Sequence, residues 1–165
     1  WEKVKKTLTK KEIKNHPARY ALVEIVNIYD EGIYFEPIHR FVVLNDRDEF
    51  IKGLKEIDAG NIEIYNGKIE KQDGNVSLPD GIKAVDKYIK EFIDKNGGTV
   101  DYVHGDENIK NLVNGNKNSV GILFNKLEKE KLFKYVIDNG SLPRKTFSMG
   151  EGIEKRYYLE GRKIK

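Results

Sequence analysis

The sequence predicts a mixed α+β fold, with a largely antiparallel sheet and helices packed on it. Runs with apolar residues at every second position alternate with runs that have the three-to-four spacing of amphipathic helices. Two pairs of strand-like runs are joined by turns too short for a helical crossover, which requires antiparallel pairing. The resulting order, β-β-α-β-β-α-β-α-β-α-β, favours an α+β layer structure over a doubly wound sheet.

The N-terminal residues predict two short helical pieces. Residues 9–15 begin with a Thr-x-x-Glu capping box and stop before Pro17. Trp1, Val4 and Leu8 have the spacing of one helix face. Because the chain opens on this stripe, we expect a single domain, residues 1–165, that is the C-terminal part of a longer protein. Residues 1–15 would be the end of a helix from the missing part, and the stripe would be an exposed patch or a homodimer contact.

Residues 20–29 are largely apolar on both faces, which is typical of a central strand. Asp30-Glu31-Gly32 is a turn signal, and residues 33–44 resume the strand pattern. The turn is too short for a crossover, so we expect these two strands to pair antiparallel. Pro37 would then mark a bulge or an edge position.

The remaining elements follow from caps, turn residues and periodicity. Asn45 or Asp46 can cap a helix, Asn66-Gly67 is a strong hairpin signal, and glycines close the later helices. In chain order we expect a helix over 47–57, a hairpin within 61–78, a helix over 82–96, a strand over 99–103, a helix over 106–113, a strand over 119–124, a helix over 127–138 and a last strand over 156–164.

Composition narrows the functional classes. The net charge is only +3, from 30 basic and 27 acidic residues mixed along the chain, which argues against a non-specific nucleic-acid binder. The absence of cysteine excludes disulfides and zinc-thiolate sites. No apolar run approaches the ~20 residues of a membrane span, and the N-terminus does not resemble a signal peptide. A cytoplasmic protein that is not bound to a membrane is therefore expected.

Residues 142–150 form the most informative segment for function. Arg144, Lys145, Thr146 and Ser148 supply cations and hydroxyls just before Gly150. Such donors hold phosphate or carboxylate, and glycine allows a ligand to approach the backbone closely. The alternative is a surface loop that caps helix ends and pairs its own carboxylates.

The three histidines show no metal-ligand spacing, so no metal site is expected. His39 follows a Glu-Pro kink beside Arg40, where a bulge would aim a side chain at a cleft. His104 ends a strand before a glycine and a helix start, a usual place for anions. We expect Arg144 or Lys145, Ser148 and His39 to surround one concave surface able to hold an anion.

Glu24 interrupts an apolar strand, where an ionised carboxylate needs a partner. Arg40 or Arg156 could supply it, and the last strand should bring Arg156 beside the sheet. Glu24 is therefore either a catalytic base or half of a structural ion pair. No Walker loop, GxSxG elbow or dinucleotide fingerprint occurs in the sequence.

Five segments of the sequence form specific blocks: HPARYALVE (16–24), NIYD (27–30), FEPIHR (35–40), LPRKTFSMG (142–150) and EKRYYLE (154–160). These blocks resemble the bacterial and archaeal family called domain of unknown function 1015. Full-length members of that family are more than twice as long. A Gly-Asp-Gly-Asn-His-Ser or Gly-His-His-Arg type box lies in them just upstream of the helix that begins this chain, and it links them distantly to the ParB and sulfiredoxin superfamily.

That superfamily binds nucleotides and includes free-serine kinases. The resemblance implies a nucleotide-dependent protein, with ATP and Mg²⁺ as cofactors of the full-length chain and its own N-terminal domain as a partner. Two hypotheses follow. In the first, the chain is half of a phosphoryl-transfer enzyme: Arg144, Lys145, Ser148, Arg156 and His104 hold phosphate, while Glu24, His39 and Arg40 act on substrate. In the second, it is a non-catalytic module that binds an anionic metabolite or a partner domain.

Overall fold

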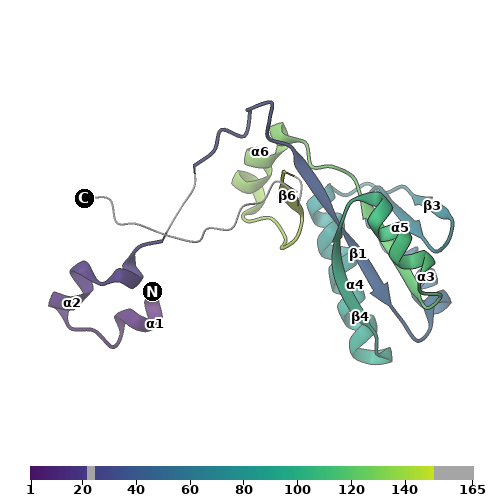
Figure 1. Ribbon diagram of the computed structural model, residues 1–165, viewed down its shortest axis with the longest axis horizontal. Helices are drawn as coiled ribbons and strands as arrows, with labels where there is room; N and C mark the ends of the chain where they lie inside the picture. The colour runs from purple at the N-terminus through teal and green to yellow at the C-terminus, as the bar shows by residue number, and fades with distance from the viewer. Residues whose placement is uncertain (22–24, 151–165) are drawn as a thin grey trace. The chain divides into compact units, whose positions relative to one another are not determined.

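The computed structural model describes residues 1–21 and 25–150, and these form two compact units (Figure 1). The first unit contains the described residues of Trp1–Ile28, and the second contains those of Tyr29–Lys155. Glu24, Arg156 and the strand expected over 156–164 lie outside the described residues.

The first unit is built from short helices: α1 (Glu2–Lys5), α2 (Lys10–Asn15) and the 3₁₀ turn η1 (Pro17–Arg19). The helix expected over 9–15 is confirmed, with its capping box. The backbone N–H of Thr9 donates to Glu12 Oε2 at 2.9 Å, and the Glu12 N–H donates to Thr9 Oγ1 at 3.4 Å. Among the described residues of 20–29 no strand forms, so the central strand expected there is wrong for those residues.

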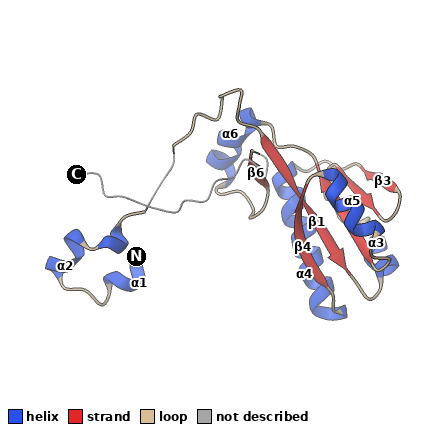
Figure 2. Ribbon diagram, viewed as in Figure 1, coloured by secondary structure: helices blue, strands red, loops and turns tan. Residues whose placement is uncertain are grey.

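The second unit contains the sheet and the longer helices, which confirms the α+β class (Figure 2). In chain order the elements are β1 (Phe35–Val43), α3 (Arg47–Leu54), β2 (Ile62–Tyr65), β3 (Ile69–Gln72), α4 (Leu78–Asn96), β4 (Thr99–His104), α5 (Asp106–Asn114), β5 (Ser119–Phe124), α6 (Lys129–Asn139) and β6 (Phe147–Met149).

The sheet is antiparallel, in the order β3-β2-β5-β1-β4, and β1 also pairs with β6, so three strands of the described part contact it. Over residues 40–43, β1 pairs with β5 on one edge and with β4 on the other. Its first residues, 35–37, pair with β6. Long-range partners therefore occupy β1, in place of the preceding segment that the short turn at 30–32 suggested. Pro37 lies opposite Phe147 of β6, at a point of β1 that precedes the residues paired with β4 and β5.

Helices cover both faces of the sheet. On one face, α3 and α4 pack on Val42 and Ile122, and the apolar core lies between them. On the other face, α5 crosses β5 so closely that a Cβ on Gly121 would lie 3.0 Å from Ile109 and 3.4 Å from Val113. The two helix layers thus separate the side chains of each strand into two different environments.

One helix begins before the expected residue, and another begins at the expected residue but with a different N-cap. Helix α4 begins at Leu78, not at residue 82, because Ser77 caps it and Pro79 occupies a first-turn position where proline is favourable. The N-cap of α5 is Gly105, so Asp106 is its first helical residue and its side chain remains available for another contact. The hairpin at Asn66-Gly67 is confirmed as β2–β3.

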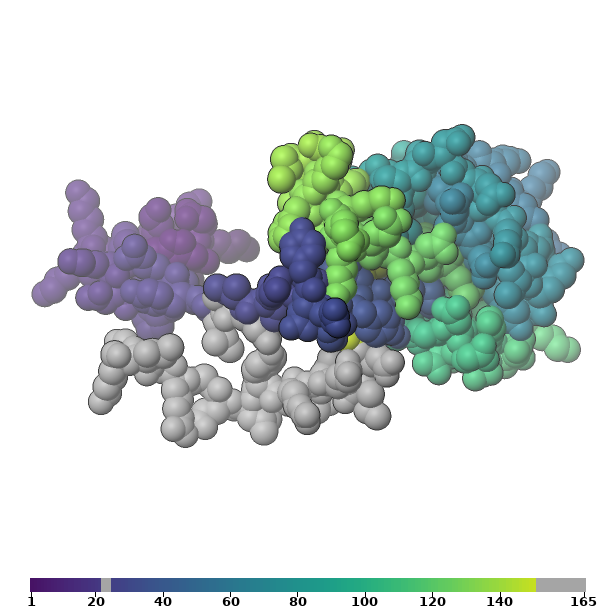
Figure 3. Space-filling view, turned by 90° about the horizontal axis from the view of Figure 1, so that it is seen from above, coloured from purple at the N-terminus to yellow at the C-terminus, as the bar shows by residue number. Residues whose placement is uncertain are grey.

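Helix α6 lies beside the segment that leads into β1 (Figure 3). Lys129 Nζ donates to the Asp30 carbonyl at 2.8 Å. On its buried side, Tyr135 donates its hydroxyl to Asp80 Oδ1 at 2.8 Å and accepts from Lys83 Nζ at 2.8 Å. These contacts fasten α6 to the first turns of α4 and place the following turn, residues 143–146, near the start of the sheet.

Candidate functional site

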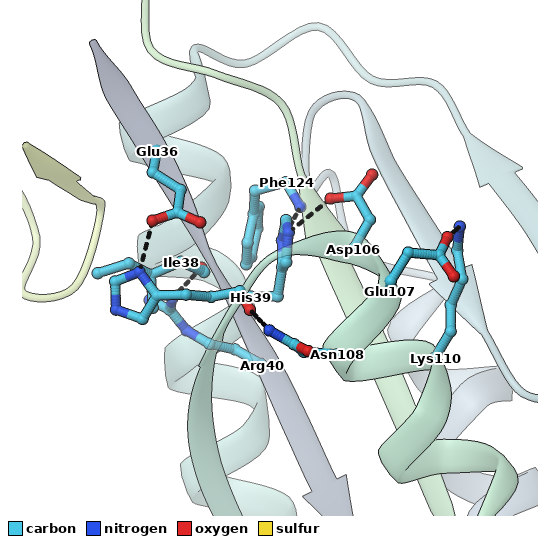
Figure 4. A network of polar contacts seen from close by, with 10 residues as sticks. Glu36, Ile38, His39, Arg40, Asp106, Glu107, Asn108, Lys110 and Phe124 are labelled. Atoms are coloured by element: carbon cyan, nitrogen blue, oxygen red, sulfur yellow. Dashed lines mark hydrogen bonds and ion pairs between the residues drawn. The ribbon is translucent and has the colours of Figure 1, made fainter. Parts of the chain in front are cut away.

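Strand alternation sends the sequence neighbours His39 and Arg40 to opposite faces of the sheet. Glu36 and Arg40 project to the face of α4, and His39 projects to the face of α5 (Figure 4). Across β4, Tyr102 pairs with Arg40 and His104 pairs with Ile38, so both share the face of Arg40. The two candidate residues therefore belong to separate clusters.

Arg40 is fully buried and forms a paired contact with Asp86 of α4. Its Nε donates to Asp86 Oδ1 at 2.8 Å, and its Nη2 donates to Oδ2 at 2.9 Å. The guanidinium carbon lies 4.8 Å from the ring centroid of Tyr102 and 5.2 Å from that of Phe124. This bidentate pair between two aromatic rings is how a buried guanidinium is compensated.

The same guanidinium also fixes the basic turn, residues 143–146. Arg40 Nη1 donates to the carbonyl of Ile38 at 2.7 Å and to that of Lys145 at 2.8 Å. The backbone of Lys145 has φ +59°, a left-handed conformation that residues other than glycine seldom adopt. Thr146 is buried and donates to the Pro143 carbonyl at 2.8 Å. The backbone of the turn, rather than its charged side chains, therefore holds its shape.

The cations of this turn point outward. Arg144 and Lys145 are exposed, and Lys145 Nζ lies 5.8 Å from the ring centroid of Tyr102. Ser148 is buried on β6, directly opposite Glu36 of β1. The structure thus brings Lys145 and Ser148 to the face that carries His104, and it does not bring His39 to them.

His39 has both ring nitrogens occupied in a buried position. Only 1 % of its side chain is exposed. The backbone N–H of Phe124 donates to Nδ1 at 3.2 Å, so Nδ1 must be the unprotonated nitrogen. Nε2 then carries the proton and donates to Asp106 Oδ1 at 2.9 Å. His39 joins β1, β5 and α5, and in this arrangement it has no lone pair left for a substrate.

His104, at the end of β4, carries its proton on the other ring nitrogen. Its Nδ1 lies 3.0 Å from Glu36 Oε2. Since an ionised carboxylate can only accept, Nδ1 carries the proton and Nε2 carries the lone pair. The side chain of His104 is 34 % exposed, that of Glu36 only 13 %. No described residue forms a hydrogen bond with Nε2, so this nitrogen can accept a proton from a ligand.

Two carboxylates of the site, Asp86 and Glu36, were not predicted from the sequence as partners of Arg40 and His104. Among the described residues Arg40 pairs with Asp86 of α4, whereas Glu24, the partner that the sequence suggested, lies outside them. A signal for Asp86 existed: it follows Ile82 by four residues and borders the apolar stripe of its helix. Glu36 carried no such signal, because its partner His104 is 68 residues away.

The fold and the site together define an α+β domain with a basic turn beside a carboxylate–histidine pair. A family model described as "Protein of unknown function (DUF1015)" matches residues 1–151. The chain therefore belongs to this family. No curated protein gives a significant match.

A solved structure titled a conserved hypothetical protein from Pyrococcus furiosus has a similar fold, with a TM-score of 0.62 at 16 % identity. The match covers 78 % of this chain and 61 % of that protein. None of the helices in the described part of the chain has the length and apolar character needed to cross a bilayer. Within the same residues, no three His, Cys, Asp or Glu side chains gather as metal ligands would.

Removing the partner of Arg40 should strongly destabilise the second unit. Asp86→Ala leaves a fully buried guanidinium without its counter-charge, which we expect to cost about 3–5 kcal/mol in the free energy of unfolding. Urea denaturation measures this cost. Asp94→Ala on the same helix removes an exposed partner of Lys90 and should cost below about 0.5 kcal/mol. Equal costs for the two variants would contradict the assigned role of Arg40.

Burial lowers the pKa of His39 below its ordinary value of 6.5, although Asp106 opposes the shift. The unfolded chain therefore binds a proton at a higher pH than the folded chain does. This contribution to stability is complete above pH 6.5 and is lost as the pH falls toward the folded-state pKa. We expect the free energy of unfolding to decrease over that range. The decrease should be smaller in His39→Asn, whose side-chain oxygen can replace Nδ1 as acceptor, and a variant with the wild-type pH profile would refute this assignment.

The two sheet histidines should be opposite tautomers when neutral. The contacts place the proton on Nε2 in His39 and on Nδ1 in His104. Long-range ¹H–¹⁵N correlation spectra above pH 7.5 distinguish the two forms by their nitrogen shifts. Finding His104 protonated on Nε2 would mean that Glu36 does not orient the ring.

Proposed function

We propose that this chain is the anion-recognising part of a phosphate- or nucleotide-dependent small-molecule enzyme, with phosphoryl transfer as its reaction class. One observation carries the proposal: the basic turn is fastened by its backbone beside the Glu36–His104 pair, while Arg144 and Lys145 remain exposed. Cations and a proton acceptor on one face are the components that handling a phosphate requires.

The cations of the turn are available for a ligand. Neither Arg144 nor Lys145 forms an ion pair with a carboxylate among the described residues. Arg40 binds the carbonyl of Lys145 and not its amine, so the turn keeps its place when its side chains engage an anion. A guanidinium binds phosphate through two parallel hydrogen bonds, and an ammonium adds a point charge.

Phosphoryl transfer suits this set of groups because it depends on positioned positive charge more than on covalent catalysis. ATP is the co-substrate that the resemblance to the ParB and sulfiredoxin superfamily suggests, with a free-serine-kinase-like reaction. The described residues offer cations for its phosphates but no cluster of carboxylates for Mg²⁺. Mg²⁺ would therefore enter bound to the nucleotide's own phosphates.

A second candidate function is a non-catalytic module that binds an anionic metabolite. It is favoured by the hydrogen bonds of His39 and Arg40, which are already made to other groups of the protein. These are the two described residues that the sequence placed on the substrate. In this alternative the basic turn recognises an anion and the site performs no chemistry. Binding without turnover of ATP, over a panel of hydroxyl-bearing metabolites, would favour the module over the enzyme.

Phosphate binding tests both versions. Isothermal titration of the chain with inorganic phosphate at low ionic strength should give a single site. Arg144→Ala with Lys145→Ala should weaken that site about ten-fold or more, since each charged hydrogen bond contributes roughly 1.5–3 kcal/mol. The unfolding midpoint should change little, because both side chains are exposed.

The matched control is Lys87→Ala with Lys90→Ala on α4, which removes the same charge from an exposed helix face. Phosphate affinity should be nearly unchanged in this control. Equal losses of phosphate affinity in the two double variants would mean that net charge, and not the basic turn, causes the binding. A wild-type chain that binds neither phosphate nor ATP would refute the proposal.

A further inference from the structure

We infer that His104 is the proton-accepting residue of this site, that Glu36 is its positioning residue, and that the second substrate is a molecule with a hydroxyl group. This inference rests on the proposed function and adds to it the residue that takes the proton of the hydroxyl group. The contrast between the two sheet histidines carries it. His39 is buried and both of its ring nitrogens are hydrogen-bonded, whereas about a third of the His104 side chain is exposed and its Nε2 has no partner among the described residues.

The Glu36 carboxylate fixes both the orientation and the tautomer of His104. The carboxylate is 13 % exposed and accepts the Nδ1 proton at 3.0 Å. The bond occupies Nδ1 and leaves the lone pair on Nε2. Holding the ring in one orientation and one tautomer is how a carboxylate supports a histidine base.

The dyad lies within reach of the basic turn. His104 follows Tyr102 by two residues on the same face of β4, a separation of about 7 Å along the strand. Lys145 Nζ is 5.8 Å from the Tyr102 ring centroid. An anion held by Lys145 and Arg144 would therefore have His104 at its edge, with Ser148 opposite Glu36 on the neighbouring strand.

The proton acceptor indicates a hydroxyl as the attacking group. In the transfer, the hydroxyl oxygen forms a bond to the terminal phosphorus of a nucleoside triphosphate, and its proton moves to His104 Nε2. The bond between that phosphorus and the bridging oxygen breaks, and the nucleoside diphosphate leaves with the electron pair. Atoms and charges balance with no other reactant, and the proton later returns to solvent.

The test uses the reaction of diethyl pyrocarbonate with unprotonated imidazole nitrogen, followed for each histidine by peptide mass spectrometry. N-acetylhistidine in the same solution serves as the reference for reagent activity. His104 should react readily and His39 should be nearly inert. Inorganic phosphate should slow the modification of His104 several-fold, because it covers Nε2 and donates its own O–H to it.

Variants at Glu36 distinguish a role in orienting the His104 ring from a role in the stability of the fold alone. Glu36→Gln keeps an oxygen that can accept the Nδ1 proton, so the tautomer and the protection by phosphate should persist. Glu36→Leu removes the acceptor, so His104 should show a mixture of tautomers and weaker protection while the chain stays folded by circular dichroism. An unchanged tautomer in the leucine variant would overturn the role of Glu36.

The failure of this inference differs from the failure of the proposed function. If titration shows phosphate binding while the modification rate of His104 does not change, the dyad lies apart from the anion site and the inference is wrong. If phosphate and ATP do not bind at all, the proposed function itself fails. Protection of His104 that is lost in the Arg144→Ala, Lys145→Ala variant supports both.

Discussion

The second unit depends on one buried charge. The Arg40 guanidinium is inaccessible to solvent, yet it contacts four separate parts of the chain: Asp86 on α4, the rings of Tyr102 and Phe124, and the carbonyl of Lys145. A buried cation is tolerated only when its donors are compensated, so each of these elements is constrained to its place around the guanidinium. Strand β1, helix α4 and the basic turn therefore meet at a single side chain.

This constraint bears on the anion site that we propose for the basic turn. The basic turn follows α6 and holds a left-handed residue, Lys145, that would be unfavourable in a free loop. Arg40 binds its backbone and leaves the side chains of Arg144 and Lys145 toward solvent. The charged groups are thus presented on a rigid frame, and an anion that binds them does not need to order the turn first.

Much of the fold could be predicted because its signals are local. The capping box at Thr9, the Asn66-Gly67 hairpin and the apolar stripe of α4 each act within a few residues, and the structure contains all three. The partners of β1 could not be predicted in this way. The short turn at 30–32 favoured a local hairpin, but β4, β5 and β6 occupy the strand from far along the sequence.

For the candidate site, the sequence by itself determined the chemical inventory, and it placed both His39 and Arg40 on the substrate, although neighbours on a strand face opposite sides of the sheet. The exposure of the basic turn was also predictable, because cations and hydroxyls between two elements favour a surface loop. Only the tertiary structure decided that His39 is sealed, that Arg40 pairs with Asp86, and that Glu36 orients His104. The physical reason is that a histidine's tautomer, burial and free lone pair are set by groups brought together across the sheet, and no spacing within the sequence records those contacts.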